Sequence, residues 1–260
     1  GLPTEVNAVA ELKNGVVLVT GPTGSGKSTT LAAMIEARNA GSENHIITVE
    51  DPIEFLHANR RSMVSQREIG SDTRDWSSAL KNALRQAPDV ILIGEIRDRE
   101  AMEHAIAFAQ TGHLCLASLH ANNAHQALER IINFFPEDRR RQLLMDLSLD
   151  LVAIVSQRLV PLKEGTGRAA ALEILLRSPL VRDLVREGKL DDLHELMKRS
   201  RDAGMQSFDQ SLFDLYEAQR ITEDEALRNA DSTAELRQMI HYQSRHARPA
   251  QDSGLQIDRR

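Results

Sequence analysis

The sequence predicts an α/β protein with a mainly parallel sheet, followed by a small helical C-terminal region. Three observations carry this prediction. Short apolar runs alternate with helical patterns in the first two-thirds of the chain, a glycine-rich loop joins one such run to a helical pattern, and short helices replace the alternation after Pro179. With 260 residues, the chain is long enough to bury a sizeable core.

The expected strands are apolar runs, and the segments between them have helical spacing. Right-handed crossovers then place the loops that follow the strands at the carboxyl edge of the sheet. Asp98 is placed to cap the helix that follows it. One long helix is expected over residues 136–160, before a turn at 165–167. The expected strands are 16–20, 46–49, 90–93, 114–118 and 168–176, and the other expected helices are 29–39, 76–86 and 99–109.

The character of the chain changes after Pro179, so we expect a core over residues 1–177 and a separate helical region over 178–242. Residues 243–260 are polar and interrupted by proline and glycine, which predicts a disordered tail. The helices expected in the C-terminal region are 179–187, 191–202, 208–219, 222–229 and 232–242.

Composition disfavours several classes of protein. A net charge of −6 and a pI near 5.9 argue against a dedicated nucleic-acid binder. The single cysteine, Cys115, cannot form an internal disulfide or complete a tetracysteine zinc site, which fits a reducing cytosol. No apolar run reaches the roughly 18 residues of a membrane span, and the first residues do not resemble a signal peptide. A soluble protein is expected, which leaves docking to a membrane through a partner open.

Residues 21–28 read Gly-Pro-Thr-Gly-Ser-Gly-Lys-Ser and predict a nucleoside triphosphate site. Glycines let the backbone curl so that its N–H groups face the phosphates, and the following helix adds its positive end. We expect Lys27 to bridge the β- and γ-phosphates and the Ser28 hydroxyl to hold Mg²⁺. A chance match in a turn is the alternative, but a strand and a helix flank the loop as the motif requires. The expected binding residues are Gly21, Pro22, Thr23, Gly24, Ser25, Gly26, Lys27, Ser28 and Thr29.

Carboxylates follow two of the expected strands. The apolar run that ends at Gly94 delivers Glu95 beside the phosphate loop, where it can polarise the water that attacks the γ-phosphate. The alternative for Glu95 is a cap on the next helix, and the phosphate loop favours catalysis. Glu50, Asp51 and Glu54 reach the same edge, which suggests Mg²⁺ and water positioning. For Asp51, a turn before the following proline is an equal alternative.

Two histidines bracket the expected strand at 114–118. A lone histidine beside a strand is usually a satisfied core residue. His120, however, ends the strand beside the γ-phosphate, where it could donate a hydrogen bond and sense phosphate loss. A zinc site is not expected, because His113, His120 and His125 lack a ligand spacing and the only cysteine cannot complete a set.

Four segments, at 21–28, 47–55, 90–98 and 112–121, together resemble the Walker A, Asp box, Walker B and His box of the secretion ATPase superfamily. Within that superfamily the sequence resembles the type IV pilus retraction ATPases, the PilT/PilU family, up to about Tyr242. The segments that carry this second resemblance are 19–34, 50–55 and 66–68. Segments 204–209 and 226–232 resemble the PilU branch more than the PilT branch.

The resemblance implies a RecA-like P-loop NTPase core that forms a homo-hexameric ring, hydrolyses ATP with Mg²⁺ and powers or assists pilus retraction and twitching motility. By motif, it implies that Glu95 is the catalytic glutamate, Glu54 the Asp-box carboxylate and His120 the His-box residue that faces the γ-phosphate. Implied partners are other copies of the chain, a related retraction ATPase and an inner-membrane platform protein, and no nucleic acid. The implied location is cytoplasmic, at the inner-membrane face, with membrane contact only through partners.

The sequence departs from the family pattern in two places. Members begin with an N-terminal PAS-like domain that contributes arginines to the neighbouring subunit, and this sequence starts after that domain would end. Hydrolysis by the chain alone is therefore expected to be poor. Residues 179–186 lack the opening of the family's Ala-Ile-Arg motif, which favours an accessory motor.

Two other functions compete with a motor. The first is a nucleotide-gated module that docks on a partner motor and turns over little ATP itself. The second is a nucleic-acid translocase, disfavoured by the acidic balance and by one tryptophan and two tyrosines for base stacking. Arg85 and Arg97 are the candidates for arginines that act on a neighbouring site, and each could equally pair with an acid of its own chain.

Overall fold

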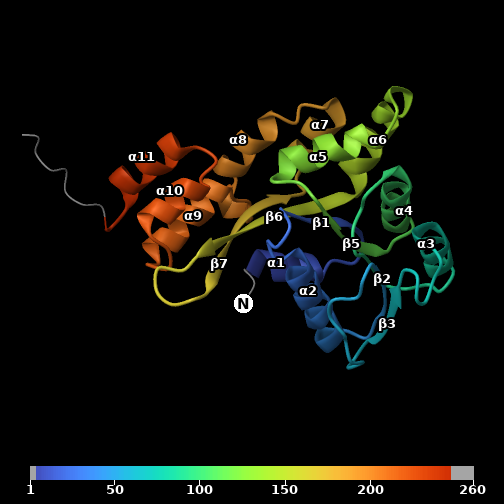
Figure 1. Cartoon of the computed structure of the whole chain (residues 1–260). Helices are drawn as coiled ribbons and strands as arrows, with labels where there is room; N and C mark the ends of the chain where they lie inside the picture. The colour runs from blue at the N-terminus through green and yellow to red at the C-terminus, as the bar shows by residue number, and fades with distance from the viewer. Residues whose placement is uncertain (1–3, 247–260) are drawn as a thin grey trace, which may run out of the picture. The chain divides into compact units, whose positions relative to one another are not determined.

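The computed structural model describes residues 4–246, which belong to two compact units (Figure 1). The first unit comprises Gly1–Leu159 and Leu172–Ser207, and the second comprises Val160–Ala171 and Phe208–Arg260. The boundary expected at residue 177 thus falls inside the first unit. The expected tail lies outside the described residues from position 247 onward.

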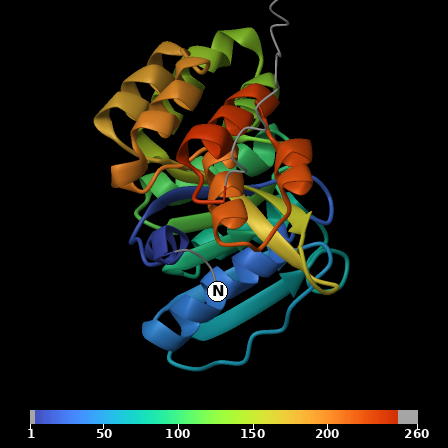
Figure 2. The ribbon, with the colours of Figure 1, turned by 90° about the vertical axis from the view of Figure 1, so that its left-hand side faces the viewer.

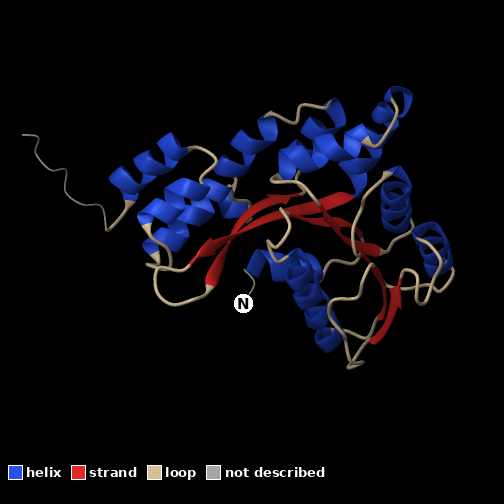
Figure 3. Ribbon diagram, in the orientation of Figure 1, coloured by secondary structure: helices blue, strands red, loops and turns tan. Residues whose placement is uncertain are grey.

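Seven strands form one sheet in the order β3-β2-β4-β5-β1-β6-β7 (Figure 3). Every pairing from β3 across to β6 is parallel, so the predicted α/β fold with a mainly parallel sheet is confirmed. The strands are β1 (Gly15–Thr20), β2 (His45–Glu50), β3 (Met63–Glu68), β4 (Val90–Ile93), β5 (Leu114–Leu119), β6 (Leu151–Pro161) and β7 (Arg168–Leu176).

Helices cover both faces of the sheet in the first unit. Val16 and Leu18 of β1 join an apolar cluster with α4, α5 and α6, whereas Val17 and Val19 join a second cluster with Met34 of α2. Because both faces are buried, β1 is apolar without alternation. Figures 1 and 3 show α1 and α2 on one face and α5 and α7 on the other. The helices are α1 (Thr4–Ala10), α2 (Lys27–Gly41), α3 (Trp76–Leu84), α4 (Arg99–Gln110), α5 (Ala124–Asn133), α6 (Glu137–Asp150), α7 (Pro179–Glu187) and α8 (Asp192–Arg199), with a 3₁₀ turn at Arg201–Ala203.

The second unit has its own core. Phe208 and Leu212 pack with Leu236 and with Val160 and Ala171. Its helices, orange to red in Figure 2, are α9 (Phe208–Glu217), α10 (Glu223–Asn229) and α11 (Thr233–Gln243). This separate cluster is the reason that the helical pattern after Pro179 divides, with α7 and α8 in the first unit and α9 to α11 in the second.

The expected helix over residues 136–160 is wrong beyond residue 150. The chain ends α6 at Asp150 and enters β6, which pairs in parallel with β1. Residues 151–155 are all apolar and buried, so they show neither a helical nor an alternating period. Their place beside the central strand decides the conformation, because a β-branched run packs well between two covered faces.

Other expected elements agree with the structure to within a few residues. The Asp98 carboxylate accepts a hydrogen bond from the Ala101 N–H at 2.9 Å and caps α4, as predicted. Besides β6, three elements were not predicted, namely α1, β3 and α5.

Cys115 is the second residue of β5, and its burial raises the pKa of the thiol to about 12. The thiolate is the reactive form, so we expect the native chain to resist an aromatic disulfide reagent at about pH 8. The same reagent should label the thiol rapidly and completely in denaturant, followed by absorbance of the released chromophore. Fast stoichiometric labelling of the native chain would contradict the buried position.

Candidate functional site

The loop over residues 21–26 joins β1 to α2, and its glycines allow its shape. Gly21, Gly24 and Gly26 have φ values of 151°, 76° and 89°, a region that residues with a Cβ rarely adopt. Gly26 sits immediately before the first residue of α2. The loop therefore turns the chain from strand to helix while its backbone N–H groups stay near the start of the helix.

Lys27 is the first residue of α2, and its side chain folds back onto this loop. Its Nζ donates hydrogen bonds to the carbonyl oxygens of Gly21 at 2.9 Å and Pro22 at 3.1 Å. Burial lowers the pKa of Lys27, and the charges of Glu95 and Glu54 act in the opposite direction. The loop thus holds a largely buried amine where an anion could replace the two carbonyl contacts.

Among the three glycines of the loop, Gly21 is the position where a side chain would meet the closest neighbours. A Cβ there would stand 2.5 Å from the backbone oxygen of Gln157 and 2.4 Å from the Ser25 Oγ, whereas a Cβ on Gly24 would meet nothing within 4 Å. We expect Gly21→Ala to lower the free energy of unfolding by roughly 2–6 kcal/mol, from overpacking and backbone strain together. Gly24→Ala should cost about 1–2 kcal/mol from strain alone. Chemical denaturation of both variants checks the order, and equal losses would contradict the close approach.

The carboxylate of Glu54 reaches the first turn of α2. The Ser28 hydroxyl donates a hydrogen bond to Glu54 Oε1 at 3.0 Å. The loop that carries Glu54 is fixed by β3, because Glu68 Oε2 accepts from the Ile53 N–H at 3.0 Å and the Gln66 amide donates to the Phe55 carbonyl at 2.8 Å. The strand that was not predicted therefore positions a predicted site residue.

Glu95 follows β4 and meets His120, which follows β5. Glu95 Oε1 lies 3.3 Å from His120 Nε2, and Glu95 Oε2 accepts from Arg97 Nε at 2.6 Å. The Glu95 side chain is 17% exposed, and Arg97 Nη1 also reaches Asp51 at 3.5 Å. Burial, followed by the charge of Lys27, lowers the pKa of His120, so its imidazole is neutral near pH 7. The hydrogen bond to Glu95 raises the pKa of Arg97.

Two residues considered from the sequence lie away from this edge. His113 immediately precedes β5, at the opposite end of the strand from His120. Its Nδ1 lies 3.1 Å from the carbonyl oxygen of Phe108. Arg85 ends α3, before β4 begins. The structure thus brings Ser28 to Glu54 and Glu95 to His120 and Arg97, and it leaves His113 and Arg85 outside.

Gln157 braces the loop and was missed from the sequence. It is buried in β6, where its amide nitrogen donates to the Ser25 carbonyl and its Oε1 accepts from the Thr30 hydroxyl at 2.8 Å. The amide nitrogen of Gln157 therefore holds the loop, and its amide oxygen holds the first turn of α2. The signal was available, because Ser156 and Gln157 are polar residues that interrupt an apolar run.

A second buried network continues from this brace. The Thr20 hydroxyl donates to the Ser156 Oγ at 2.9 Å, and that hydroxyl donates to Glu173 Oε1 at 3.2 Å. The same carboxylate oxygen accepts from the N–H of Ala124, the first residue of α5, at 2.7 Å. The end of β1 and the start of α5 are thus fixed to one carboxylate, which is 1% exposed.

Over residues 4–246, the structure has no group of three or more His, Cys, Asp or Glu side chains placed to hold a metal ion. Within the same residues, no helix combines the length and apolar character needed to span a bilayer.

The glycine-rich loop after β1, the Lys27 amine that contacts it and the acid that follows β4, two strands away in the sheet, can accommodate a polyphosphate. A mainly parallel sheet with this loop after an interior strand defines a P-loop protein with a RecA-like core. The family model described as Type II/IV secretion system protein matches residues 3–252. The chain belongs to this family.

Individual relatives are close in sequence and in structure. The type IV pilus ATPase PilU of Pseudomonas aeruginosa is 58% identical over 239 residues, which cover 92% of this chain and 63% of the relative. A twitching motility protein of Neisseria gonorrhoeae is 43% identical over 90% of this chain and 63% of its own length. The crystal structure of the pilus retraction motor PilT with bound ADP superposes with a TM-score of 0.85 at 44% identity, over 92% of this chain and 68% of that one. The chain thus spans about two-thirds of each.

Proposed function

We propose that the chain binds ATP with Mg²⁺ at residues 21–29 and hydrolyses it with Glu95 as the catalytic carboxylate. One observation carries the proposal: Glu95 and His120 meet at 3.3 Å at the sheet edge whose loop holds Lys27. A carboxylate beside a phosphate loop can accept a proton from, and orient, the water that attacks the γ-phosphate. The matching relatives named ATPase and retraction motor support the same chemistry.

The donor set fits Mg²⁺. The hydroxyl of Ser28 and the carboxylate of Glu54 are 3.0 Å apart, and both are the oxygen ligands that this ion accepts alongside phosphates and water. Ser28 would hold the ion directly, and Glu54 would bind its water or the Ser28 hydroxyl. When bound, Mg²⁺ neutralises charge that develops on the phosphates.

The other side chains have positioning roles in this proposal. Lys27 would leave the two loop carbonyls and bind the β- and γ-phosphates. Neutral His120 can hold Glu95 through one ring N–H or donate that N–H to the γ-phosphate. Gln157 keeps the Ser25 carbonyl turned away from the phosphates, so the loop N–H groups stay free for them.

At the level of the machine, we propose a homo-hexameric motor that powers or assists type IV pilus retraction, docked through an inner-membrane platform protein at the cytoplasmic face. The relatives named for the type IV pilus, twitching motility and pilus retraction support this assignment. The family's N-terminal PAS-like domain would supply residues to the neighbouring subunit.

A second candidate is an accessory module that binds nucleotide, docks on a related motor and turns over little ATP. The contact between Arg97 Nε and Glu95 Oε2, at 2.6 Å, favours it. The guanidinium occupies one oxygen of the Glu95 carboxylate, so that oxygen is not free to contact the attacking water. In this alternative, a partner would have to withdraw Arg97.

Steady-state phosphate release from Mg-ATP, measured across a range of protein concentrations, tests the proposal. A turnover per chain that rises with concentration indicates a site completed by a neighbouring subunit. A version extended at the N-terminus should be faster at matched concentration. ATP binding without turnover at any concentration would favour the accessory module, and absence of ATP binding would refute both.

A further inference from the structure

A cavity of about 540 Å³ opens beside the phosphate loop, on the side of α5. Its walls come from three parts of the first unit, and most of their side chains are polar. The loop, the end of β5 and one side of α5 contribute Gly21, Pro22, His120, Asn122, Gln126 and Arg130.

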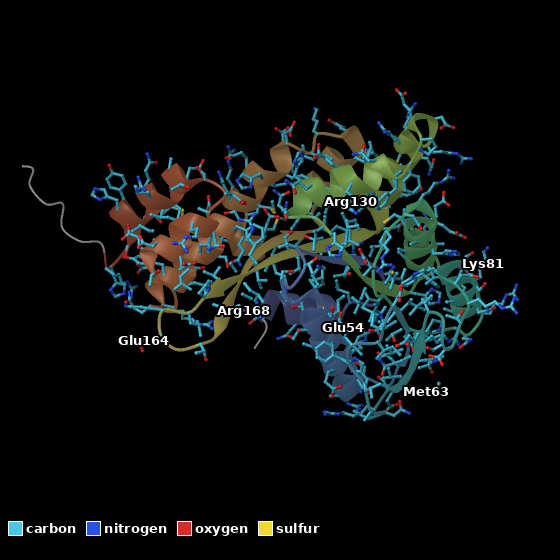
Figure 4. The ribbon with its side chains drawn as sticks, in the orientation of Figure 1. Glu54, Met63, Lys81, Arg130, Glu164 and Arg168 are labelled. Carbon is cyan, nitrogen blue, oxygen red and sulfur yellow. The ribbon has the colours of Figure 1, made fainter. Side chains whose placement is uncertain are left out.

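Arg130 is the cation of this wall, and Figure 4 labels it on α5. Among the described residues its guanidinium pairs with no carboxylate, and it lies over the ring of Phe134 with 6.0 Å between Cζ and the ring centroid. Arg97 differs from Arg130, because its guanidinium forms ion pairs with both Glu95 and Asp51. Arg130 is also exposed, so its donors can reach a ligand in the cavity.

The electrostatic surroundings point in the same direction. The charge of Arg130 contributes to the lowered pKa of His120, after burial and the charge of Lys27, so the two side chains share one space. Glu129 is the carboxylate on this wall, and one of its oxygens lies 3.9 Å from His125 Nδ1. The remaining polar side chains of the wall include the amides of Asn122 and Gln126, which can donate hydrogen bonds.

We propose that Arg130 binds the terminal phosphate of the nucleoside triphosphate that occupies its own chain's phosphate loop. A guanidinium presents a planar fork of donors that matches two phosphate oxygens. The cavity begins at Gly21 and Pro22 of the loop, and it ends at α5. A diphosphate bound in the loop would lack the group that reaches this wall, so Arg130 distinguishes triphosphate from diphosphate. This inference rests on the proposed function.

Equilibrium titration of the full chain with Mg²⁺ tests the inference, using fluorescent ADP and a non-hydrolysable ATP analogue that carries the same fluorophore. Arg130→Gln should weaken binding of the triphosphate analogue by roughly tenfold or more and binding of ADP by less than about twofold. Arg130→Lys keeps the charge without the fork, so its triphosphate affinity should lie between the two. Arg99→Gln is the matched control, because Arg99 stacks over Phe135 at 5.6 Å but does not line the cavity.

Two results would overturn the inference while the proposed function stands. One is equal weakening of both nucleotides in Arg130→Gln, as expected if Arg130 only supports Phe134 and the fold of α5. The other is unchanged affinity for both. If the wild-type chain binds neither nucleotide, the proposed function fails, and this inference fails with it.

Discussion

Replacing Lys27 by alanine should weaken ADP and triphosphate binding by at least about 10²-fold, because each hydrogen bond to a charged partner contributes about 1.5–3 kcal/mol. The amine now contacts the Gly21 and Pro22 carbonyls, 2.9 and 3.1 Å away, inside the loop. A bound polyphosphate would take over those contacts and gain a charged partner in a largely buried site. Alanine removes that partner and leaves the phosphates facing two acids. Equilibrium titration with a fluorescent nucleotide measures the loss.

Lys81→Ala is the control for this substitution. Lys81 is exposed on α3 and lies 3.8 Å from Glu100, so its removal also deletes one positive charge that has a carboxylate partner. Its nucleotide affinity should stay within about twofold of wild type, because an exposed pair contributes little and lies outside the loop. Wild-type affinity in Lys27→Ala would show that the loop does not bind the phosphates.

Glu95→Gln should reduce the rate of ATP hydrolysis by about 10²–10⁴-fold, the range for loss of a general base. Nucleotide affinity should change little, since the amide keeps the size of the side chain and can still contact His120 and Arg97. The amide cannot accept a proton from water at neutral pH, which is why turnover and not binding should fall. Phosphate release and nucleotide titration on the same preparation separate the two effects.

The matched control for Glu95 is Glu103→Gln. Glu103 is also paired with an arginine, since Arg99 Nε donates to it at 2.7 Å, but it lies on α4 away from the loop. Turnover of this variant should equal that of wild type. Similar turnover in Glu95→Gln and wild type would assign the reaction to another group and remove the basis of the proposed mechanism.

Much of the site could be predicted because its residues stand at strand ends. A strand, a glycine-rich loop and a helix each have a recognisable sequence pattern. Parallel strands then bring their carboxyl ends to one edge of the sheet. That logic places Glu95 and His120 each at the edge beside the phosphate loop, and in the structure they lie 3.3 Å apart. It left open whether Arg97 pairs with an acid of its own chain, because that contact depends on side-chain geometry, and in the structure Arg97 contacts Glu95.

The elements that escaped prediction did so for identifiable reasons. The first half of β6 is apolar without interruption, so its hydrophobic pattern does not distinguish a strand from a helix. Only its pairing with β1 identifies it as a strand. β3 is an edge strand with a polar sequence, Met-Val-Ser-Gln-Arg-Glu, which carries no apolar alternation. By contrast, α5 had a usable signal in Asn123, whose side chain caps the helix, and in the spacing of the buried Ala127, Leu128 and Ile131.

The buried network around Glu173 and the exposed pair of Arg97 with Glu95 should respond differently to ionic strength. Salt screens charges that face water, with a range of about 8 Å under physiological conditions, and it acts far less on buried hydrogen bonds. Added salt therefore loosens the hold of Arg97 on the acid, while the strand end and the helix that bears Arg130 keep their spacing. Ionic strength therefore acts on the ion pair that holds Glu95 and leaves the buried hydrogen bonds that position α5 unchanged.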